Sequence, residues 1–151
     1  FTQLLVYGAV PIVNENDTIS TYEIQFGDND RLSALVSALV EADLLILLSD
    51  IDGLYTDDPN INKDAEFISF VEDVDKYMDK GKATSKSGLG TGGMYTKLLA
   101  AQIATNSGCD MVIASAEDMS IIENIANGEE IGTYFPAKSN KDFDWLNCLE
   151  E

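Results

Sequence analysis

The sequence predicts an α/β fold in which helices cover a largely parallel sheet. Short apolar runs that suit buried strands alternate with segments of helical periodicity along most of the chain. The clearest strand is Leu44–Leu48, a continuous apolar run expected to form a central parallel strand covered on both faces. The clearest helix follows Asp30, because apolar residues recur at helical spacing from Leu32 to Val40. With 151 residues the chain is long enough for one domain with its own core.

The first part of the chain is expected to contain shorter elements. Phe1–Tyr7 is predicted to end a helix, with Gly8 directly after its last turn. Val10–Val13 is predicted as a short buried strand, and Ile19–Phe26 as an arm of a hairpin. Asp30 is a suitable N-cap for the helix that follows it.

The later part of the chain continues the alternation of strands and helices and ends in an acidic tail. The expected elements are a strand at Phe67–Val71, a helix at Met94–Asn106 closed by Gly108, a strand at Met111–Ala114, a helix at Met119–Ala126 closed by Gly128 and a strand at Ile131–Phe135. Residues 139–151 are expected to form a tail that packs through Trp145.

Charge and composition exclude several classes of function. The net charge is −18, from 27 acidic and 9 basic residues, which argues against a nucleic-acid partner or an anionic membrane surface. The apolar runs are too short to span a bilayer, so we expect no membrane association. Cys109 and Cys148 are too few for a disulfide framework, which favours a cytoplasmic location. The chain has no histidine, and this removes His-based general bases and metal sites.

A glycine- and lysine-rich stretch stands out in this acidic chain. Lys86–Lys97 contains four glycines and two lysines and leads into an apolar, alanine-rich helix. Glycines let backbone N–H groups approach a ligand, and a helix beginning near Met94 would add N–H donors that favour phosphate. The stretch matches neither the dinucleotide fingerprint, which needs a preceding strand, nor the P-loop, which needs Lys where Met94 stands. A flexible glycine linker is the structural alternative for this stretch.

Polar residues follow each of the two early predicted strands. Asn14–Thr18 comes directly after Val10–Val13, and Ser49–Pro59 comes after the central strand. Open α/β sheets bind ligands at the carboxyl ends of their strands. An ordinary polar turn is the alternative for the first cluster, since Asn and Asp favour turns. A third cluster, Gly27–Asp30, contains more polar residues than helix capping alone requires.

These clusters and the glycine-rich stretch together resemble the glutamate 5-kinase branch of the amino acid kinase family. The resemblance rests on Val10–Asp17, Gly27–Asp30 with Leu32–Ala34, Leu48–Pro59 and Gly88–Lys97, and it covers residues 1–138. It implies a partial amino acid kinase fold and ATP-dependent phosphorylation of the γ-carboxylate of L-glutamate, a step of proline synthesis. ATP, Mg²⁺ held mainly through the phosphates, and a homo-oligomeric assembly are implied with it.

The resemblance also implies roles for individual residues. Asp30 and Lys97 would be catalytic, with Asp30 orienting lysines and Lys97 neutralising charge in the transition state. The implied glutamate-binding residues are Asn14, Asp17, Asp28 and Asn29. The implied ATP-binding residues are Ser49, Asp50, Tyr55, Asp58, Thr91, Gly92, Gly93, Met94, Tyr95, Thr96 and Lys97.

Two features of the family pattern are not found in this sequence. The family's domain begins with a strand and a lysine-bearing glycine turn, followed by a serine-bearing segment, so this chain is expected to correspond to the C-terminal half of that domain. Residues 139–151 are too few for the PUA domain of many relatives, so we expect a tail without this domain there, and we expect the chain alone to be incomplete as an enzyme. Three alternatives stay open: another acyl-phosphate kinase of the family, a non-catalytic nucleotide-binding or sensor module, and a structural acidic fragment.

Overall fold

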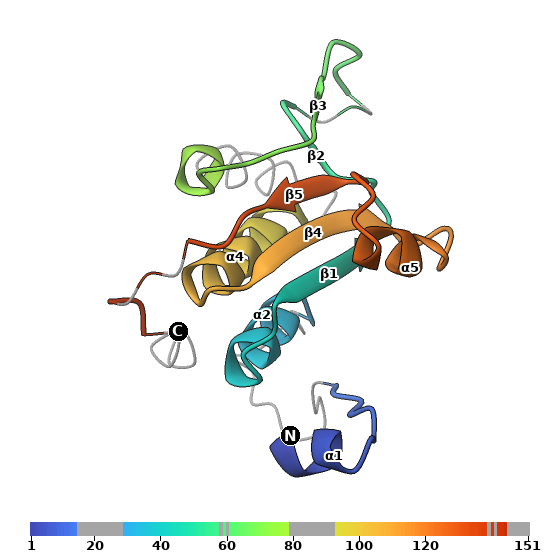
Figure 1. Cartoon of the computed structure of the whole chain (residues 1–151). Helices are drawn as coiled ribbons and strands as arrows, with labels where there is room; N and C mark the ends of the chain where they lie inside the picture. The colour runs from blue at the N-terminus through green and yellow to red at the C-terminus, as the bar shows by residue number, and fades with distance from the viewer. Residues whose placement is uncertain are drawn as a thin grey trace, which may run out of the picture.

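A mixed sheet with helices on both faces forms the centre of the fold (Figure 1). The computed structural model describes residues 1–14, 29–57, 59, 61–78, 93–138, 140 and 142–144. The main sheet has the strand order β1-β4-β5, with β1 at Leu44–Ser49, β4 at Asp110–Ser115 and β5 at Thr133–Phe135. β1 and β4 are parallel, with Leu44 opposite Asp110 and Ser49 opposite Ser115. β5 runs antiparallel to β4.

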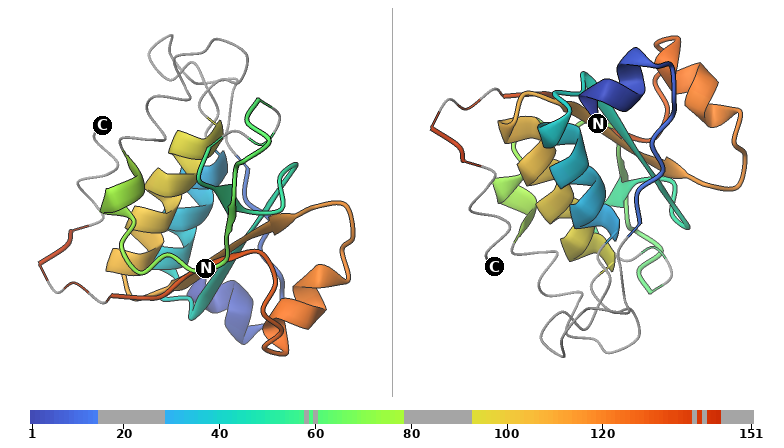
Figure 2. Two further views of the ribbon diagram at one scale, coloured as in Figure 1. Left: turned by 90° about the horizontal axis from the view of Figure 1, so that it is seen from above. Right: turned by 90° about the horizontal axis from the view of Figure 1, so that it is seen from below.

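Two long helices pack on one face of this sheet, and Figure 2 shows them side by side from both directions. They are α2, Asn29–Leu39, and α4, Gly93–Asn106. Alternate strand residues, such as Leu47, Met111 and Ile113, point into the core that the two helices complete. Phe135 is fully buried in the same core. Burial of a side chain of this size contributes about 1.5–3 kcal/mol, so this layer provides much of the stability.

The opposite face of the sheet is covered by a short helix, α5, Ile121–Ala126. Ile125 packs there with Val112 and Ala114, the strand residues that alternate with those of the first face. A helix of this length spans about 9 Å, whereas a strand such as β4 spans about 20 Å. The connection through α5 therefore does not carry the chain back along β4, and β5 returns beside β4 in the antiparallel direction.

A two-stranded hairpin lies next to β5. Its strands are β2, Leu54–Tyr55, and β3, Phe67–Ile68, which pair antiparallel. The chain after β3 then runs beside β5, because Tyr134 N–H donates to Ser69 O at 2.9 Å and Val71 N–H donates to Tyr134 O at 2.9 Å. The hairpin is thus continuous with the far edge of the main sheet.

Glycine ends three of the helices as the sequence predicts. Gly8, after α1 at Thr2–Val6, has φ +70°, and Gly108 and Gly128 have φ +90° and +91°. The left-handed conformation is favourable for glycine and lets the next N–H groups bond back to the last turn. α2 closes in the same way with Glu41 at φ +53°, a conformation that strains any residue with a Cβ.

Two expectations from the sequence are wrong in the described residues. Val10–Val13 forms no strand there: Val10 and Ile12 are 86% and 96% exposed, and Pro11 lacks the N–H that a sheet ladder needs. β1 is covered on both faces as predicted, but it is an edge strand in the described sheet and β4 is the central one. An apolar run predicts that both faces of a strand are buried, but it does not predict whether the strand pairs with one or two other strands.

Other expectations agree with the structure or fall outside it. The helix at Met94–Asn106 and the strand at Met111–Ala114 are confirmed within one residue at each end. The strand at Phe67–Val71 is present as β3 with a bridge from Phe70 to Tyr134. The proposed hairpin arm at residues 19–26 and Trp145 lie outside the described residues. No helix in the described ranges is long and apolar enough to cross a bilayer.

We expect Gly132→Ala to destabilise the fold far more than Gly128→Ala. Both glycines have a positive φ, so alanine costs about 1–2 kcal/mol of backbone strain at either position. At Gly132 the new Cβ would also collide with the backbone carbonyl of Ile113, whereas nothing lies within 4 Å at Gly128. Urea denaturation should give a loss above about 4 kcal/mol at Gly132. Equal losses for the two variants would contradict the close approach of β5 to β4.

Candidate active site

The candidate site begins where the first turns of α2 and α4 meet. The two helices approach closely because small residues lie between them: Ala34 of α2 and Ala100, Ala101 and Ala104 of α4 are fully buried. Asp30 lies in the first turn of α2, and Thr96 and Lys97 lie in the first turns of α4. The helix packing thus brings residues that are more than sixty positions apart in sequence into contact.

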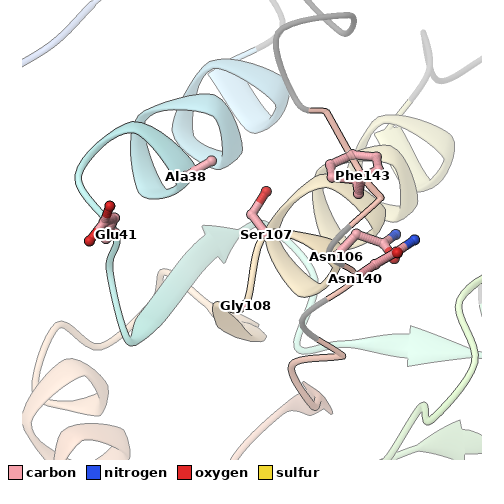
Figure 3. Close-up of a pocket in the computed structure, with 7 residues that line it drawn as sticks. All are labelled: Ala38, Glu41, Asn106, Ser107, Gly108, Asn140 and Phe143. Carbon is pink, nitrogen blue, oxygen red and sulfur yellow. The ribbon is translucent and has the colours of Figure 1, made fainter.

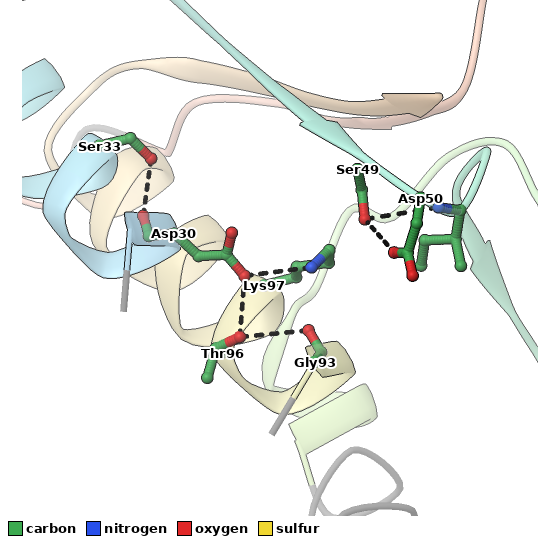
Figure 4. Close-up of polar contacts among 8 residues, drawn as sticks. Asp30, Ser33, Ser49, Asp50, Gly93, Thr96 and Lys97 are labelled. Carbon is green, nitrogen blue, oxygen red and sulfur yellow. Dashed lines mark hydrogen bonds and ion pairs between the residues drawn. The ribbon is translucent and has the colours of Figure 1, made fainter. Parts of the chain in front are cut away.

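Asp30 joins the two helices through one carboxylate oxygen. Its Oδ2 accepts a hydrogen bond from Thr96 Oγ1 at 2.8 Å and lies 3.2 Å from Lys97 Nζ (Figure 4). The side chains of Lys97 and Asp30 are only 11% and 20% exposed. A charge this poorly solvated is costly unless it is paired, so the carboxylate and the ammonium stabilise each other in place.

The carboxyl end of β1 lies on the side toward which Lys97 is directed (Figure 4). Ser49 is the last residue of β1, is 8% exposed, and donates from Oγ to Asp50 Oδ1 at 3.0 Å. Asp50 itself is exposed. The arrangement thus combines a buried lysine, an exposed carboxylate and a hydroxyl near one end of the sheet.

Tyr55 lies on the hairpin, beyond the loop that follows β1. Its phenol donates to the Asp52 carboxylate, with both oxygens at 3.1 Å, and its ring packs edge to face on Phe67. Burial raises the pKa of Tyr55, and the hydrogen bond and charge of Asp52 raise this pKa further. The hydrogen bond to Asp52 and the contact with Phe67 together orient the tyrosine ring.

The structure brings together part of the site that the sequence predicts. Asp30, Thr96 and Lys97 are in contact, and Ser49 and Asp50 lie at the end of the strand toward which Lys97 points. The remaining described residues of the prediction lie on several elements. Asn29 begins α2, the first turn of α4 contains Gly93, Met94 and Tyr95, and Tyr55 is in β2. Asn14 is exposed and directly follows Val13, and among the described residues no hydrogen bond or ion pair joins it to Asp30 or Lys97. Those outside the described residues are Asp17, Asp28, Asp58, Thr91 and Gly92.

Asp30 is not the N-cap that its sequence position suggests. α2 already begins at Asn29, so Asp30 lies inside the first turn. Its carboxylate accepts hydrogen bonds from α4. Sequence position favoured capping because a cap is a local interaction, whereas the contact with Lys97 depends on how two distant helices pack.

Sequence reasoning also missed Ser115 and Thr133. Ser115 ends β4 directly opposite Ser49, so the same carboxyl edge carries a second serine. The signal was available, since Ser115 follows a predicted strand as Ser49 does. Thr133 is fully buried and bonds to the hairpin. No local pattern marks such a long-range hydrogen bond.

A pocket of about 440 Å³ lies at the other ends of α2 and α4 (Figure 3). It is lined by Ala38, Glu41, Asn106, Ser107, Gly108, Asn140 and Phe143. Ser107 Oγ is buried and has no hydrogen-bond partner among the described residues. The pocket contains none of the predicted site residues, so it is separate from the candidate active site. Within the described ranges no group of three or more Cys, Asp or Glu side chains is placed to hold a metal ion.

Comparison with known proteins now identifies the family. The sequence profile described as "Amino acid kinase family" matches residues 1–115 of this chain. The chain belongs to the amino acid kinase family. This assignment agrees with the sequence motifs and with a lysine at the start of a glycine-led helix.

Curated members of the amino acid kinase family include proteins closely similar to this chain. Glutamate 5-kinase of Carboxydothermus hydrogenoformans is 53% identical over 148 residues, covering 97% of this chain and 40% of that protein. Glutamate 5-kinase of Clostridium perfringens is 50% identical over 145 residues, covering 93% of this chain and 54% of that protein. The chain therefore spans about half the length, or less, of the curated relatives that it matches.

Solved structures show the same amino acid kinase fold at lower identity. Isopentenyl phosphate kinase from T. acidophilum aligns with a TM-score of 0.60 and 21% identity, covering 89% of this chain and 50% of that one. Uridylate kinase from Archaeoglobus fulgidus aligns with a TM-score of 0.53 and 22% identity, covering 70% and 45%. At this identity the likeness establishes the fold, and the predicted α/β class is confirmed.

We expect Asp30 and Lys97 to be strongly coupled in a double-mutant cycle. The single variants Asp30→Asn and Lys97→Met and the double variant should be compared by urea denaturation. Because the pair is poorly solvated, we expect a coupling free energy of about 1–3 kcal/mol that changes little with salt.

The surface pair Asp73–Lys138 is the matched control for this cycle. Its atoms approach to 3.4 Å, but the side chains are 35% and 38% exposed, so a coupling below about 1 kcal/mol is expected. A coupling for Asp30 and Lys97 no larger than that of the control pair would contradict the role of this contact in joining α2 to α4.

Proposed function

We propose that this protein is an ATP-dependent kinase that phosphorylates the γ-carboxylate of L-glutamate, giving glutamyl 5-phosphate for proline synthesis. The observation that carries the proposal is the buried Lys97, held by Asp30 at the start of α4 and directed toward the carboxyl end of β1. The curated relatives at about half identity, named glutamate 5-kinase, support glutamate as the acceptor. The proposal takes residues 1–138 as part of the kinase domain, residues 139–151 as a tail, and the cytoplasm as the location.

Phosphoryl transfer needs positioned substrates and groups that neutralise charge, and the described residues offer part of both. A carboxylate oxygen of glutamate attacks the γ-phosphorus of ATP, the bond to the β,γ-bridging oxygen breaks, and ADP leaves. The attacking carboxylate is already ionised, so no general base is required, and the lack of histidine in this chain does not oppose the proposal. Catalysis then depends mainly on positioning and on neutralising the phosphoryl charge.

Lys97 and the start of α4 are suited to that neutralisation. The ammonium supplies one positive charge, and the N-terminal end of α4, through its backbone N–H groups and the positive end of the helix dipole, favours phosphate oxygens. Asp30 keeps the lysine in a fixed position, so little reorganisation is needed when charge develops on the phosphoryl group. Thr96 restricts the same carboxylate through its own hydrogen bond.

The opposite side of the site would receive the nucleotide. Ser49 and Asp50 at the end of β1 and the Tyr55 ring on the hairpin are the described groups proposed to contact it. Mg²⁺ commonly binds through one or two carboxylates together with substrate phosphates, and the exposed Asp50 carboxylate fits that requirement. The ion would supply positive charge next to the phosphates.

A hydroxamate assay tests the function directly. Glutamyl phosphate formed from ATP and L-glutamate is trapped by hydroxylamine, and aspartate and N-acetylglutamate serve as competing acceptors. Product with glutamate alone supports the proposal. Product mainly with another acceptor would indicate a different acyl-phosphate kinase of the family. Because this chain is expected to be the C-terminal half of the domain, the assay is run on this chain and on the complete domain. ATP binding by the complete domain without product for any acceptor would favour a nucleotide-binding module instead.

In the complete kinase domain, we expect Lys97→Met to lower the turnover number about 100- to 1000-fold, because the transition state loses one fixed positive charge. Methionine fills the buried space, so the fold should persist. Lys138→Met is the control, because it also removes one lysine charge, from an exposed ion pair with Asp73. Steady-state kinetics with saturating ATP measure the effect, and a folded Lys97→Met variant with near-normal turnover would exclude a catalytic role for this lysine.

We expect Asn29→Ala to raise the KM for glutamate about tenfold while changing the KM for ATP much less. Asn29 is exposed at the first residue of α2, next to Asp30, where its amide can bond to the polar groups of the acceptor. Asn127→Ala removes an exposed amide at the end of α5 and should change neither value. Equal increases in both KM values would instead indicate a structural role for Asn29 in starting α2.

A further inference from the structure

One buried hydroxyl joins the β2–β3 hairpin to the main sheet. Thr133 of β5 is fully buried, and its Oγ1 accepts a hydrogen bond from Leu54 N–H at 2.7 Å and donates one to Ile68 O at 2.6 Å. Leu54 and Ile68 are opposite each other in the hairpin. A single side-chain oxygen therefore bonds to both strands of the hairpin at one position of their pairing.

The hairpin depends on such external contacts. Two strands of two residues each are marginal alone, and their own ladder continues through the bond from Thr56 N–H to Glu66 O. The chain after β3 also bonds to Tyr134, which attaches only the β3 side. Leu54 of β2 is tied to β5 by the Thr133 hydroxyl, and β2 is the strand that carries Tyr55.

Gly53, in the loop between β1 and β2, lies close to the Thr133 hydroxyl. A Cβ placed on Gly53 would lie 2.5 Å from Thr133 Oγ1 and 2.7 Å from Cε2 of Phe67, so only glycine allows the contact without displacement. On one side of Gly53 is Asp52, whose carboxylate holds the Tyr55 phenol, and on the other is Leu54. The Thr133 contact therefore fixes the backbone between Asp52, which bonds to the Tyr55 phenol, and Leu54, which precedes Tyr55 in the chain.

We infer that Thr133 is a positioning residue for nucleotide binding: by holding Gly53 and Leu54 against β5, it places the Asp52–Tyr55 pair on the nucleotide side of the site. The inference rests on the proposed function, in which Tyr55 contacts ATP. Thr133 itself is buried beneath the hairpin and contacts no substrate. Its effect is transmitted through the Leu54 and Ile68 backbone, and it is independent of the Asp30–Lys97 contact at the helix ends.

The test compares Thr133→Val, which keeps the shape of the side chain and removes its hydrogen bonds, with Thr133→Ser, which keeps the hydroxyl. Thr105→Val is the matched control, because Thr105 is also buried and its hydroxyl bonds to Ala101 O at 2.8 Å, inside α4 and away from the hairpin. Calorimetry gives the affinity of each variant for ATP and for glutamate, and hydrogen exchange of the Leu54 amide reports the contact itself.

We expect Thr133→Val to exchange the Leu54 amide faster and to weaken ATP binding about tenfold, with glutamate binding little changed. Thr133→Ser and Thr105→Val should bind ATP with near-wild-type affinity. If Thr133→Val does not fold, Thr133→Cys takes its place, because a thiol is only a weak donor and acceptor.

Two results would overturn the inference while leaving the proposed function intact. One is faster exchange at Leu54 with unchanged ATP affinity, and the other is unchanged exchange at Leu54. A wild-type chain that binds no ATP would instead overturn the proposed function, and it would also overturn the positioning role of Thr133.

Discussion

The close packing of α2 against α4 is the interaction on which the rest of the site depends. Both helices lie on one face of the sheet with their first turns together, and fully buried alanines form much of the contact between them. Larger side chains at Ala34 or Ala101 would separate the helix axes, and the Asp30 carboxylate would no longer reach Lys97 and Thr96. Small residues in the core thus determine a polar geometry at the surface. The alanine-rich composition of α4 has this structural consequence in addition to its favourable helix propensity.

The net negative charge of the chain makes the Asp30–Lys97 contact important for a second reason. A protein with a net charge of −18 repels a polyanion at a distance, so its general field does not attract ATP. Affinity for phosphate must then come from short-range groups, and the start of α4 offers both a lysine and backbone N–H donors. The lysine is poorly solvated, and without a carboxylate beside it the folded state would carry an unpaired buried charge. By pairing with Lys97, the Asp30 carboxylate stabilises a positive charge at the start of α4.

How much of this was predictable depends on how local each interaction is. β1, α4 and the helix-ending glycines follow from apolar runs, periodicity and backbone conformation, all of which are local signals. Lys97 and Ser49 were predicted for the same reason, since each follows directly from a recognisable strand or glycine-led helix. Val10–Val13 was mistaken for a strand because the same pattern occurs in exposed segments. The Asp30 contact with α4 and the Thr133 contact with the hairpin join residues more than sixty positions apart, so no local pattern encodes them. The family resemblance implied a lysine partner for Asp30, and nothing in the sequence indicated the Thr133 contact.

These contacts divide the candidate site into parts that different elements control. Under the proposed function, the phosphoryl end would depend on the helix pair, through Asp30 and Lys97. The nucleotide side would depend on the attachment of a small hairpin to β5, through Thr133. The proposed acceptor residues belong to segments near the start of α2. Because the first arrangement can stay fixed while the acceptor segments vary, one fold can transfer phosphate from ATP to chemically different acceptors. Within this division, packed alanines would set the geometry of the proposed phosphoryl end, and one buried hydroxyl would set the geometry of the proposed nucleotide side.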